Sequence, residues 1–256
     1  MLRSSVLCIS GHDPTGGAGI HADIEAVAAQ GSHALGLITA LTTQDTQDVL
    51  HVHATPVDLL ERQAACLLQD CPVAAVKVGL IGCATQLPLI AGWIQRLGVP
   101  TVIDPILRAG GGAALLGDQE ASVLLDVLLP LATVLVPNAA EVRRLGGDAD
   151  TERAAERLLR RTGVPHLLVT GGDEPGSTVI NHWYRPGAMP LRFEWPRVPA
   201  RFHGAGCTLA AALAGRLAQG DPVAEALANA QEYVVRTLNA ATAPGRGRRV
   251  PRRILQ

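Results

Sequence analysis

The sequence predicts an α/β protein in which helices cover both faces of a mostly parallel central sheet. Short β-branched runs alternate with stretches rich in Ala and Leu along nearly the whole chain, which is the pattern of repeated β-α units. Aromatic residues make up only 3% of the 256 residues, so the core is built from aliphatic side chains, as buried parallel strands require. Two later strand-like runs, joined by a turn at Pro186-Gly187, predict an antiparallel edge.

Each strand and helix is predicted from a local run of residues. The chain opens with a buried strand at Val6–Ser10, and a Gly-rich loop leads from it into a helix at Ile20–Gln30. Seven further runs are expected to be strands: His33–Leu41, Val73–Gly79, Val102–Asp104, Thr133–Val136, Leu167–Val169, Ser177–Tyr184 and Leu191–Val198. Five further stretches are expected to be helices: Pro56–Leu68, Thr85–Leu97, Thr151–Arg161, Cys207–Gln219 and Val223–Ala240. Right-handed crossovers then bring the loops at the carboxyl ends of the parallel strands to one edge, where ligands usually bind.

We interpret residues 1–243 as one domain, because no internal repeat and no shift in composition marks a linker. Residues 244–256 form a basic tail, which we interpret either as a frayed end or as a segment that contacts a polyanionic substrate or an acidic neighbour. The tail contains five arginines: Arg246, Arg248, Arg249, Arg252 and Arg253.

Composition and charge argue against several classes of protein. A formal net charge of -1 gives no support for nucleic-acid binding, and no apolar stretch of about 18 residues predicts a membrane span. The residues before Gly11 are too few for the apolar region of a signal peptide. The five cysteines include no C-x-x-C pair of the kind that binds zinc. We therefore expect a cytoplasmic protein with reduced thiols and neither a membrane nor a nucleic acid as its partner.

The strongest chemical signal is the segment FHGAGCT at residues 202–208, which opens directly onto a predicted helix. Two glycines let successive backbone N–H groups point into one concavity, and the helix N-terminus adds partial positive charge. Such a loop suits a transferring phosphoryl group. The same helix end is expected to lower the pKa of Cys207 and make its thiol a base or a nucleophile. The alternative is a Gly-rich helix start with an inert, buried cysteine.

A second Gly-rich loop, at residues 11–19, follows the first predicted strand. It lacks the G-K-[ST] ending of a Walker A loop and the G-x-G-x-x-G spacing of a dinucleotide site. Asp23 falls in the first turn of the next helix, where an acid can also simply complement the helix dipole. Gln44 follows the strand His33–Leu41, and its carboxamide can recognise the donor and acceptor edge of a heterocycle or serve as an ordinary loop residue.

Acidic and amide side chains follow three other predicted strands. Asp104 ends one strand, Asn138 and Glu141 follow the next, and Gly171-Gly172-Asp173 follow a third. A carboxylate at this edge is a natural Mg²⁺ ligand, although the spacing of Asn138 and Glu141 is also that of a helix capping box. Lys77 is the only lysine in the sequence, so the positive charge that phosphates need must come from arginine, Mg²⁺ or backbone N–H groups.

Six segments, taken together and in this order, resemble the hydroxymethylpyrimidine/phosphomethylpyrimidine kinases of thiamin biosynthesis, a branch of the ribokinase superfamily. The segments are Ile9–Asp23 (ISGHDPTGGAGIHAD), Ile38–Thr46 (ITALTTQDT), Lys77–Leu80 (KVGL), Asp104–Leu107 (DPIL), Val136–Glu141 (VPNAAE) and His203–Thr208 (HGAGCT). The resemblance extends from Val6 to about Asn239. It implies a ribokinase-like fold, a homodimer, and the ATP-dependent phosphorylation of 4-amino-5-hydroxymethyl-2-methylpyrimidine and then of its monophosphate.

The resemblance also implies roles for individual residues. The pyrimidine would be bound by a group of four: Gly11, Asp23, Gln44 and Leu80. ATP would be bound by a group of six, of which the two acids would also organise Mg²⁺: Asp104, Asn138, Glu141, Thr170, Gly172 and Thr208. Cys207 would be the base, beside an anion hole formed with Gly204, Ala205 and Gly206.

The sequence departs from the family pattern at several phosphate-site positions. Gly110 and Thr170 stand where the family usually has lysine, Gly111 stands where it has serine, and Ala205 replaces a usual threonine. The arginine-rich tail replaces a Gly-rich, His-containing end. Two alternatives therefore stay open beside the pyrimidine kinase: a pyridoxal or pyridoxine kinase, and a pyrimidine-binding protein with impaired phosphoryl transfer.

Overall fold

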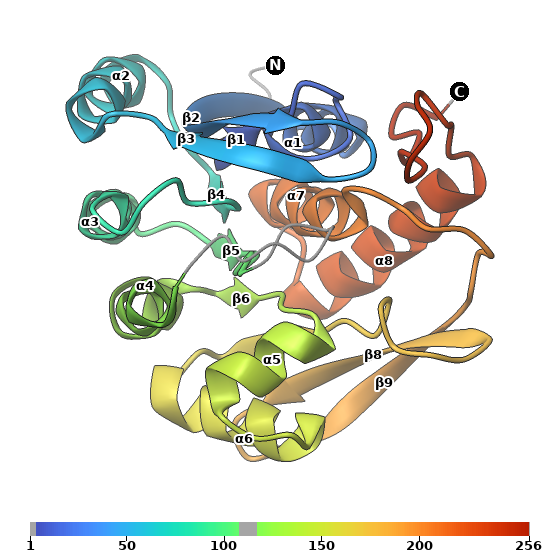
Figure 1. Cartoon of the computed structure of the whole chain (residues 1–256). Helices are drawn as coiled ribbons and strands as arrows, with labels where there is room; N and C mark the ends of the chain where they lie inside the picture. The colour runs from blue at the N-terminus through green and yellow to red at the C-terminus, as the bar shows by residue number, and fades with distance from the viewer. Residues whose placement is uncertain (1–3, 108–116, 256) are drawn as a thin grey trace.

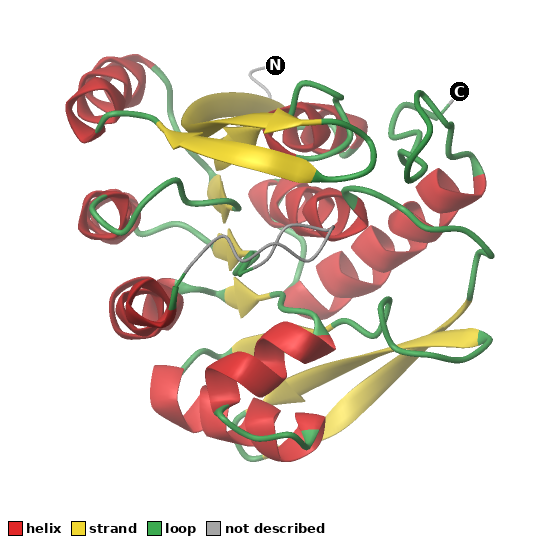
Figure 2. Cartoon of the chain, viewed as in Figure 1, coloured by secondary structure: helices red, strands yellow, loops and turns green. Residues whose placement is uncertain are grey.

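A computed structural model describes residues 4–107 and 117–255, and in these residues a nine-stranded sheet lies between two layers of helices (Figures 1 and 2). The order of the strands is β3-β2-β1-β4-β5-β6-β7-β8-β9. Their bounds are β1 Ser5–His12, β2 His33–Gln44, β3 Val49–Ala54, β4 Ala75–Val78, β5 Thr101–Ile103, β6 Val134–Leu135, β7 His166–Val169, β8 Thr178–Arg185 and β9 Ala188–Pro196. Six neighbouring strands, β2-β1-β4-β5-β6-β7, run parallel, so the predicted mostly parallel α/β fold is confirmed.

Helices cover both faces of the sheet, as predicted (Figure 1). One face carries α2 (Val57–Asp70), α3 (Gln86–Leu97), α4 (Asp118–Val123) with its continuation η1 (Leu124–Leu128) and η2 (Leu129–Leu131), α5 (Ala139–Gly146) and α6 (Thr151–Thr162). The other face carries α1 (Gly19–Ala29), α7 (Ala205–Ala218) and α8 (Val223–Asn239). No helix among the described residues is both long enough and apolar enough to span a membrane.

The central strands divide their side chains between two apolar cores. Along β1, Leu7 and Ile9 point into the core under α2 and α3, whereas Val6 and Cys8 point into the core under α1 and α7. This alternation follows from the two-residue period of a strand. On β4 the same alternation directs Lys77 away from the α2–α3 core and towards the α1–α7 side, which is where the candidate site lies.

The sheet has a second antiparallel edge that the sequence analysis did not predict. The β8–β9 hairpin forms the predicted edge, and β3 pairs antiparallel with β2 at the opposite edge. Strand β3 carries His51 and His53 and is exposed along most of its length, so it lacks the buried apolar alternation that identifies a strand in a sequence.

The basic tail packs against the body of the protein. The N–H of Arg248 donates to the Thr46 carbonyl over 2.9 Å, and the Arg249 carbonyl accepts from the His203 N–H over 2.8 Å. Arg253 is 1% exposed and forms an ion pair of 3.1 Å with Glu25. The interpretation as a frayed end is therefore wrong, and the alternative of contact with an acidic neighbour is correct for Arg253.

Candidate functional site

The candidate site lies where the carboxyl ends of β1, β4 and β5 meet the N-termini of α1 and α7. Gly204 is the residue before α7 and has φ of 83°, a left-handed conformation that favours glycine. A Cβ at this position would also overlap the Gly17 carbonyl oxygen, so the two Gly-rich loops touch here. Ala205 and Gly206 begin α7, and their backbone N–H groups have no acceptor within the helix.

Cys207 lies in the first turn of α7 and is buried among the ends of the strands. Burial raises the pKa of its thiol to about 12, although the nearby Lys77 charge acts in the opposite direction. The Gly19 N–H at the start of α1 donates to the Cys207 sulfur. The prediction that the helix end lowers this pKa is therefore wrong, because desolvation of a buried thiolate outweighs the partial charge of a helix end.

A buried ion pair lies beside this thiol. The Lys77 Nζ is 2.8 Å from Asp23 Oδ1, and both side chains have no exposed surface. Ser10 donates to Asp23 Oδ2 over 2.6 Å and accepts from Lys77 over 2.9 Å. Burial lowers the pKa of Lys77, but the charges of Asp23, Cys207 and Asp104 outweigh it and keep that pKa above its usual value. The only lysine of the chain is thus a fixed internal cation.

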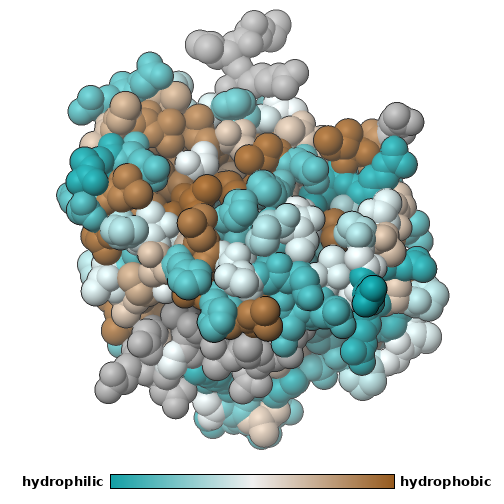
Figure 3. Space-filling view, turned by 45° about the horizontal axis from the view of Figure 1, so that its top comes forward, coloured by the Kyte–Doolittle hydropathy of each residue, from teal (hydrophilic) through white to brown (hydrophobic). Residues whose placement is uncertain are grey.

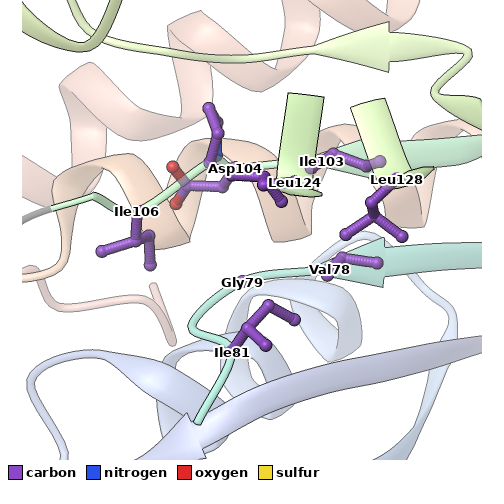
Figure 4. A pocket seen from close by; sticks show the side chains of 9 residues that line it. Val78, Gly79, Ile81, Ile103, Asp104, Ile106, Leu124 and Leu128 are labelled. Atoms are coloured by element: carbon purple, nitrogen blue, oxygen red, sulfur yellow. The ribbon is translucent and has the colours of Figure 1, made fainter. Parts of the chain in front are cut away.

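The two predicted metal-binding acids both lie at this edge of the sheet. Asp104 directly follows β5 and helps to line a narrow pocket with Gly79 and Leu124 (Figure 4). Burial raises the pKa of Asp104 to about 6, while the Lys77 charge and the nearby Cys207 thiol act in the opposite direction. Burial and then the Asp104 charge raise the pKa of Glu141 to about 8.

Glu141 also caps the helix in which it lies. Its Oε2 accepts from the Asn138 N–H over 2.9 Å, while Asn138 Oδ1 accepts from the Glu141 N–H over 2.9 Å, which completes the capping box. Its Oε1 accepts from the Leu107 N–H over 3.3 Å. The capping interpretation is confirmed, and the carboxylate still faces Asp104 closely enough to raise its own pKa.

Asp104 and Glu141 form a donor set that suits Mg²⁺. This ion usually binds one or two carboxylates together with substrate phosphates, and these two buried acids face each other at the edge of the sheet. Among the described residues there is no cluster of three or more His, Cys, Asp or Glu side chains that could hold a metal without a substrate. The set therefore fits an ion that arrives with a nucleotide.

The other expected ATP residues lie near these acids. Thr170 follows β7 and bridges to Asn138, and its carbonyl accepts from the Ala139 N–H over 3.1 Å. The Gly172 carbonyl accepts from Arg197 over 2.6 Å. Arg197 also donates to the carbonyls of Glu174 and Gly176, so this one guanidinium fixes the loop after β7. Gly110 and Gly111, where the family has a lysine and a serine, lie outside the described residues.

The expected pyrimidine residues lie at the ends of β1, β2 and β4. Gly11 and Leu80 are in contact, since a Cβ on Gly11 would come within 2.7 Å of a Leu80 methyl group. Gln44 Nε2 donates to Thr42 over 2.7 Å. One buried oxygen, Gln44 Oε1, accepts no hydrogen bond within residues 4–107 and 117–255, whereas Asp23 Oδ1 already faces Lys77 Nζ over 2.8 Å. The family resemblance assigns Gln44 to the pyrimidine, and its free oxygen is an acceptor for a donor group of a ligand.

Sequence reasoning missed a second link between the two Gly-rich loops. Asp13 and His203 are both buried, and His203 Nε2 lies 2.9 Å from Asp13 Oδ2. Burial alone would raise the pKa of Asp13, but the contact with His203 and the Thr15 N–H lower it to about 2. The sequence feature that could have indicated this contact is an aspartate in one Gly-rich loop and a histidine in the other, although the two residues are 190 positions apart.

Comparisons with known proteins show which family this chain resembles and which fold it shares. Residues 13–251 match the family described as phosphomethylpyrimidine kinase. The hydroxymethylpyrimidine/phosphomethylpyrimidine kinase of Rhizobium meliloti is 37% identical over 94% of this chain and 92% of that protein. The thiamine biosynthesis bifunctional protein ThiED of Geobacter sulfurreducens is 38% identical over 96% of this chain, which spans 51% of that protein. The crystal structure of an ADP complex of Bacillus subtilis pyridoxal kinase matches with a TM-score of 0.88 and 27% identity, over 97% of each chain.

The raised pKa values of the two acids predict how the stability of the ligand-free protein depends on pH. Asp104 and Glu141 bind protons more tightly in the folded protein than in the unfolded chain, where the reference pKa values are 3.8 and 4.5. Their contribution is complete below these values and is lost as pH rises through about 6 and about 8. We expect the free energy of unfolding to fall by on the order of 5 kcal/mol between pH 5 and pH 8. Urea unfolding across this range measures it.

The glutamine of Glu141→Gln cannot titrate, so in this variant the free energy of unfolding should change less with pH between pH 6 and pH 8 than in the wild type. Glu61→Gln on the exposed face of α2 is the matched control and should follow the wild-type curve. Parallel curves for the wild type and Glu141→Gln would show that Glu141 titrates normally.

Proposed function

This chain belongs to the phosphomethylpyrimidine kinase family, and we propose that the residues around Cys207 perform its reaction. The reaction is the ATP-dependent phosphorylation of 4-amino-5-hydroxymethyl-2-methylpyrimidine and of its monophosphate, within thiamin biosynthesis. The family match over residues 13–251 supports this activity. The observation that supports the assignment of residues is the convergence of Cys207, Asp104 and the start of α7 at one edge of a ribokinase-like sheet.

The first turn of α7 stabilises the transferring phosphoryl group in this proposal. The N–H groups of Ala205, Gly206 and Cys207 have no helical acceptor, and the positive end of the helix dipole lies with them. Charge on the equatorial oxygens of the phosphoryl group grows during transfer, so fixed donors at this place lower the barrier. Gly204 provides the turn that aims these donors, and Thr208 closes the helix start by donating to the Gly204 carbonyl over 2.7 Å.

Cys207 and Asp104 accept the proton that the substrate releases. When the hydroxymethyl oxygen bonds to the γ-phosphorus of ATP, the bond from phosphorus to the ADP oxygen breaks and the hydroxyl proton must leave. The thiol lies close enough to Asp104 to lower the pKa of its carboxyl, and in this proposal the thiol proton passes to that carboxylate while the sulfur takes the hydroxyl proton. In the protein without bound ligands, burial raises the pKa of Asp104 to about 6, so the carboxylate is mainly ionised at neutral pH.

Asp104 and Glu141 are the residues that would hold Mg²⁺. When bound, this ion neutralises charge on the β- and γ-phosphates. Asn138 and Thr170, which bridge the loops after β6 and β7, and Gly172 would contact the nucleotide. Arg197 donates hydrogen bonds to carbonyl groups of the loop after β7 and so holds this loop in place. The same loop begins at Thr170, where the family usually has a lysine.

The free acceptor of Gln44 supports a substrate with an amino group. A 4-aminopyrimidine presents N–H donors beside a ring nitrogen, which complements a carboxamide. Pyridoxal carries no amino group next to its ring nitrogen, so it satisfies this acceptor less well. A pyridoxal kinase stays the second candidate because of the likeness in fold to the Bacillus subtilis pyridoxal kinase.

We also propose that the kinase is a single-domain cytoplasmic homodimer. All five cysteines are unpaired thiols, as expected of a reducing compartment. Leu41 on β2 is 54% exposed, and Leu50 on the neighbouring strand β3 is 70% exposed. Figure 3 shows a group of apolar residues on the face that carries β2, β3 and α2. Apolar side chains gathered on one face suit an interface between two copies of the chain.

Substituting Cys207 tests the proposed function directly. Purified protein with Mg-ATP and the hydroxymethyl pyrimidine should yield monophosphate and diphosphate, and Cys207→Ala should lower kcat by about 10²–10⁴, the usual size of a general-base contribution. Product masses measure both phosphorylations. Cys66→Ala, which removes an exposed thiol on α2, is the matched control and should keep the wild-type rate.

Each alternative gives a different result in the same assay. A higher kcat/KM on pyridoxal than on the pyrimidine would make the protein a pyridoxal kinase. A pyrimidine that raises the melting temperature but yields no product would make it a binding protein. A Cys207→Ala variant with the wild-type rate would remove the cysteine from the mechanism.

Measuring the oligomeric state tests the proposal that the exposed face of β2 and β3 forms the dimer interface. Sedimentation at micromolar concentration should give twice the chain mass of 26.7 kDa, and Leu50→Glu should give single chains because a charge opposes burial of the strand. Met189→Glu, on the β8–β9 hairpin at the opposite edge, is the control for an exposed apolar residue. Dimers of Leu50→Glu together with monomers of Met189→Glu would move the interface to β8–β9.

A further inference from the structure

The end of the chain contacts the loops that form the candidate site. We call residues 245–253 the C-terminal strap; in Figure 1 this segment lies beside α1. The strap bonds to the loop that follows Gln44, since the Gly247 N–H donates to Thr46 Oγ1 over 3.0 Å and the Arg248 N–H donates to the Thr46 carbonyl. It also bonds to the residue before the anion hole, since the Arg249 carbonyl accepts from the His203 N–H.

Arg253 extends this contact into the interior. Its guanidinium is buried, and Nε donates to Thr208 Oγ1 over 2.8 Å. Nη1 donates to the Gly16 carbonyl over 3.2 Å and to Glu25 over 3.1 Å, and Nη2 donates to the Gly17 carbonyl. The planar fork of an arginine can serve several acceptors at once in this way, whereas the point charge of a lysine cannot.

These acceptors belong to the two walls of the site. Gly16 and Gly17 lie in the loop after β1, and Thr208 lies in the first turn of α7. Thr208 in turn donates to the carbonyl of Gly204, so a continuous chain of hydrogen bonds runs from Arg253 to the residue that opens the anion hole. The guanidinium therefore sets how the loop after β1 sits against the phosphoryl-binding turn.

We propose that Arg253 is a positioning residue for phosphoryl transfer, which holds the anion hole and the loop after β1 in the geometry that the reaction requires. The inference rests on the proposed kinase function and concerns a residue outside the segments that resemble the family. Arg253 bonds to loop backbone and side chains behind the site, so it acts on the rate of transfer through Thr208 and the glycine carbonyls. Its loss should change kcat more than the affinity for the pyrimidine.

The strap stays attached to the body when the guanidinium is removed. Tyr233 donates its hydroxyl proton to the Arg253 carbonyl over 2.7 Å, and the Arg252 N–H donates to the Thr237 carbonyl over 3.1 Å. Both bonds use the backbone of the strap. A side-chain substitution at Arg253 therefore leaves these anchors in place, and the variant can be assayed as a folded protein.

The test compares Arg253→Ala and Arg253→Lys with Arg252→Ala, a neighbouring arginine whose side chain is exposed. We expect Arg253→Ala to lower kcat by about 10²-fold, the loss that follows when a distant change misplaces reacting groups. We expect the Kd of the pyrimidine, measured by calorimetry, to change by less than about threefold. Arg253→Lys should lose about tenfold in kcat, because it keeps the charge without the fork, and Arg252→Ala should match the wild type.

Chemical rescue separates a positioning role from a structural one. Guanidinium ion at low millimolar concentration should raise the kcat of Arg253→Ala severalfold and leave that of the wild type unchanged. The inference would be overturned if Arg253→Ala melted at a lower temperature but kept the wild-type kcat at temperatures where it is folded. It would also be overturned if Arg253→Ala lost affinity for the pyrimidine at unchanged kcat. A wild type without turnover would contradict the proposed function itself, whereas wild-type turnover that Arg253→Ala leaves intact would overturn this inference alone.

Discussion

The site depends on one constraint, which is that a charged lysine lies inside the sheet. Lys77 has no exposed surface, and the desolvation of such an ion costs several kcal/mol unless an opposite charge lies beside it. Asp23 supplies that charge from α1, and Ser10 supplies a hydrogen bond from β1. The pair therefore fixes α1 against the ends of β1 and β4, and this brings the N-terminus of α1 to Cys207, where the Gly19 N–H meets the sulfur.

The internal cation also sets the electrostatics of the reacting groups. Burial raises the pKa of Cys207 and of Asp104, and in both cases Lys77 is the group that opposes the rise. Asp104 thus stays within reach of neutral pH as a proton acceptor, while the thiol stays protonated until the substrate arrives. The negative charge of the transferring phosphoryl group meets backbone donors at the start of α7 and meets no free lysine among the described residues. In such a site, preorganised backbone dipoles provide most of the stabilisation.

Local patterns predicted the elements and the strand-end residues well, because these depend on neighbours in the sequence. Asp104 directly follows β5 and Asn138 lies three residues after the end of β6, so their place at the edge of the sheet could be predicted. Contacts between distant segments were not predictable in the same way: Lys77 and Asp23 are 54 residues apart, and Arg253 and Gly17 are 236 apart. The direction of the Cys207 pKa shift was predicted wrongly for the same reason, since the helix end is visible in the sequence and the burial that outweighs it is not.

The most direct test of this account is a double-substitution cycle on the buried pair, with Lys77→Met, Asp23→Asn and the double variant measured by urea unfolding. Lys77→Met leaves a buried carboxylate without its cation, so it should cost about 3–5 kcal/mol. The double variant removes both charges and should be more stable than Lys77→Met alone, which would show that the two residues stabilise the fold as a pair. Additive losses, or a Lys77→Met protein as stable as the wild type, would contradict the claim that this ion pair organises the site.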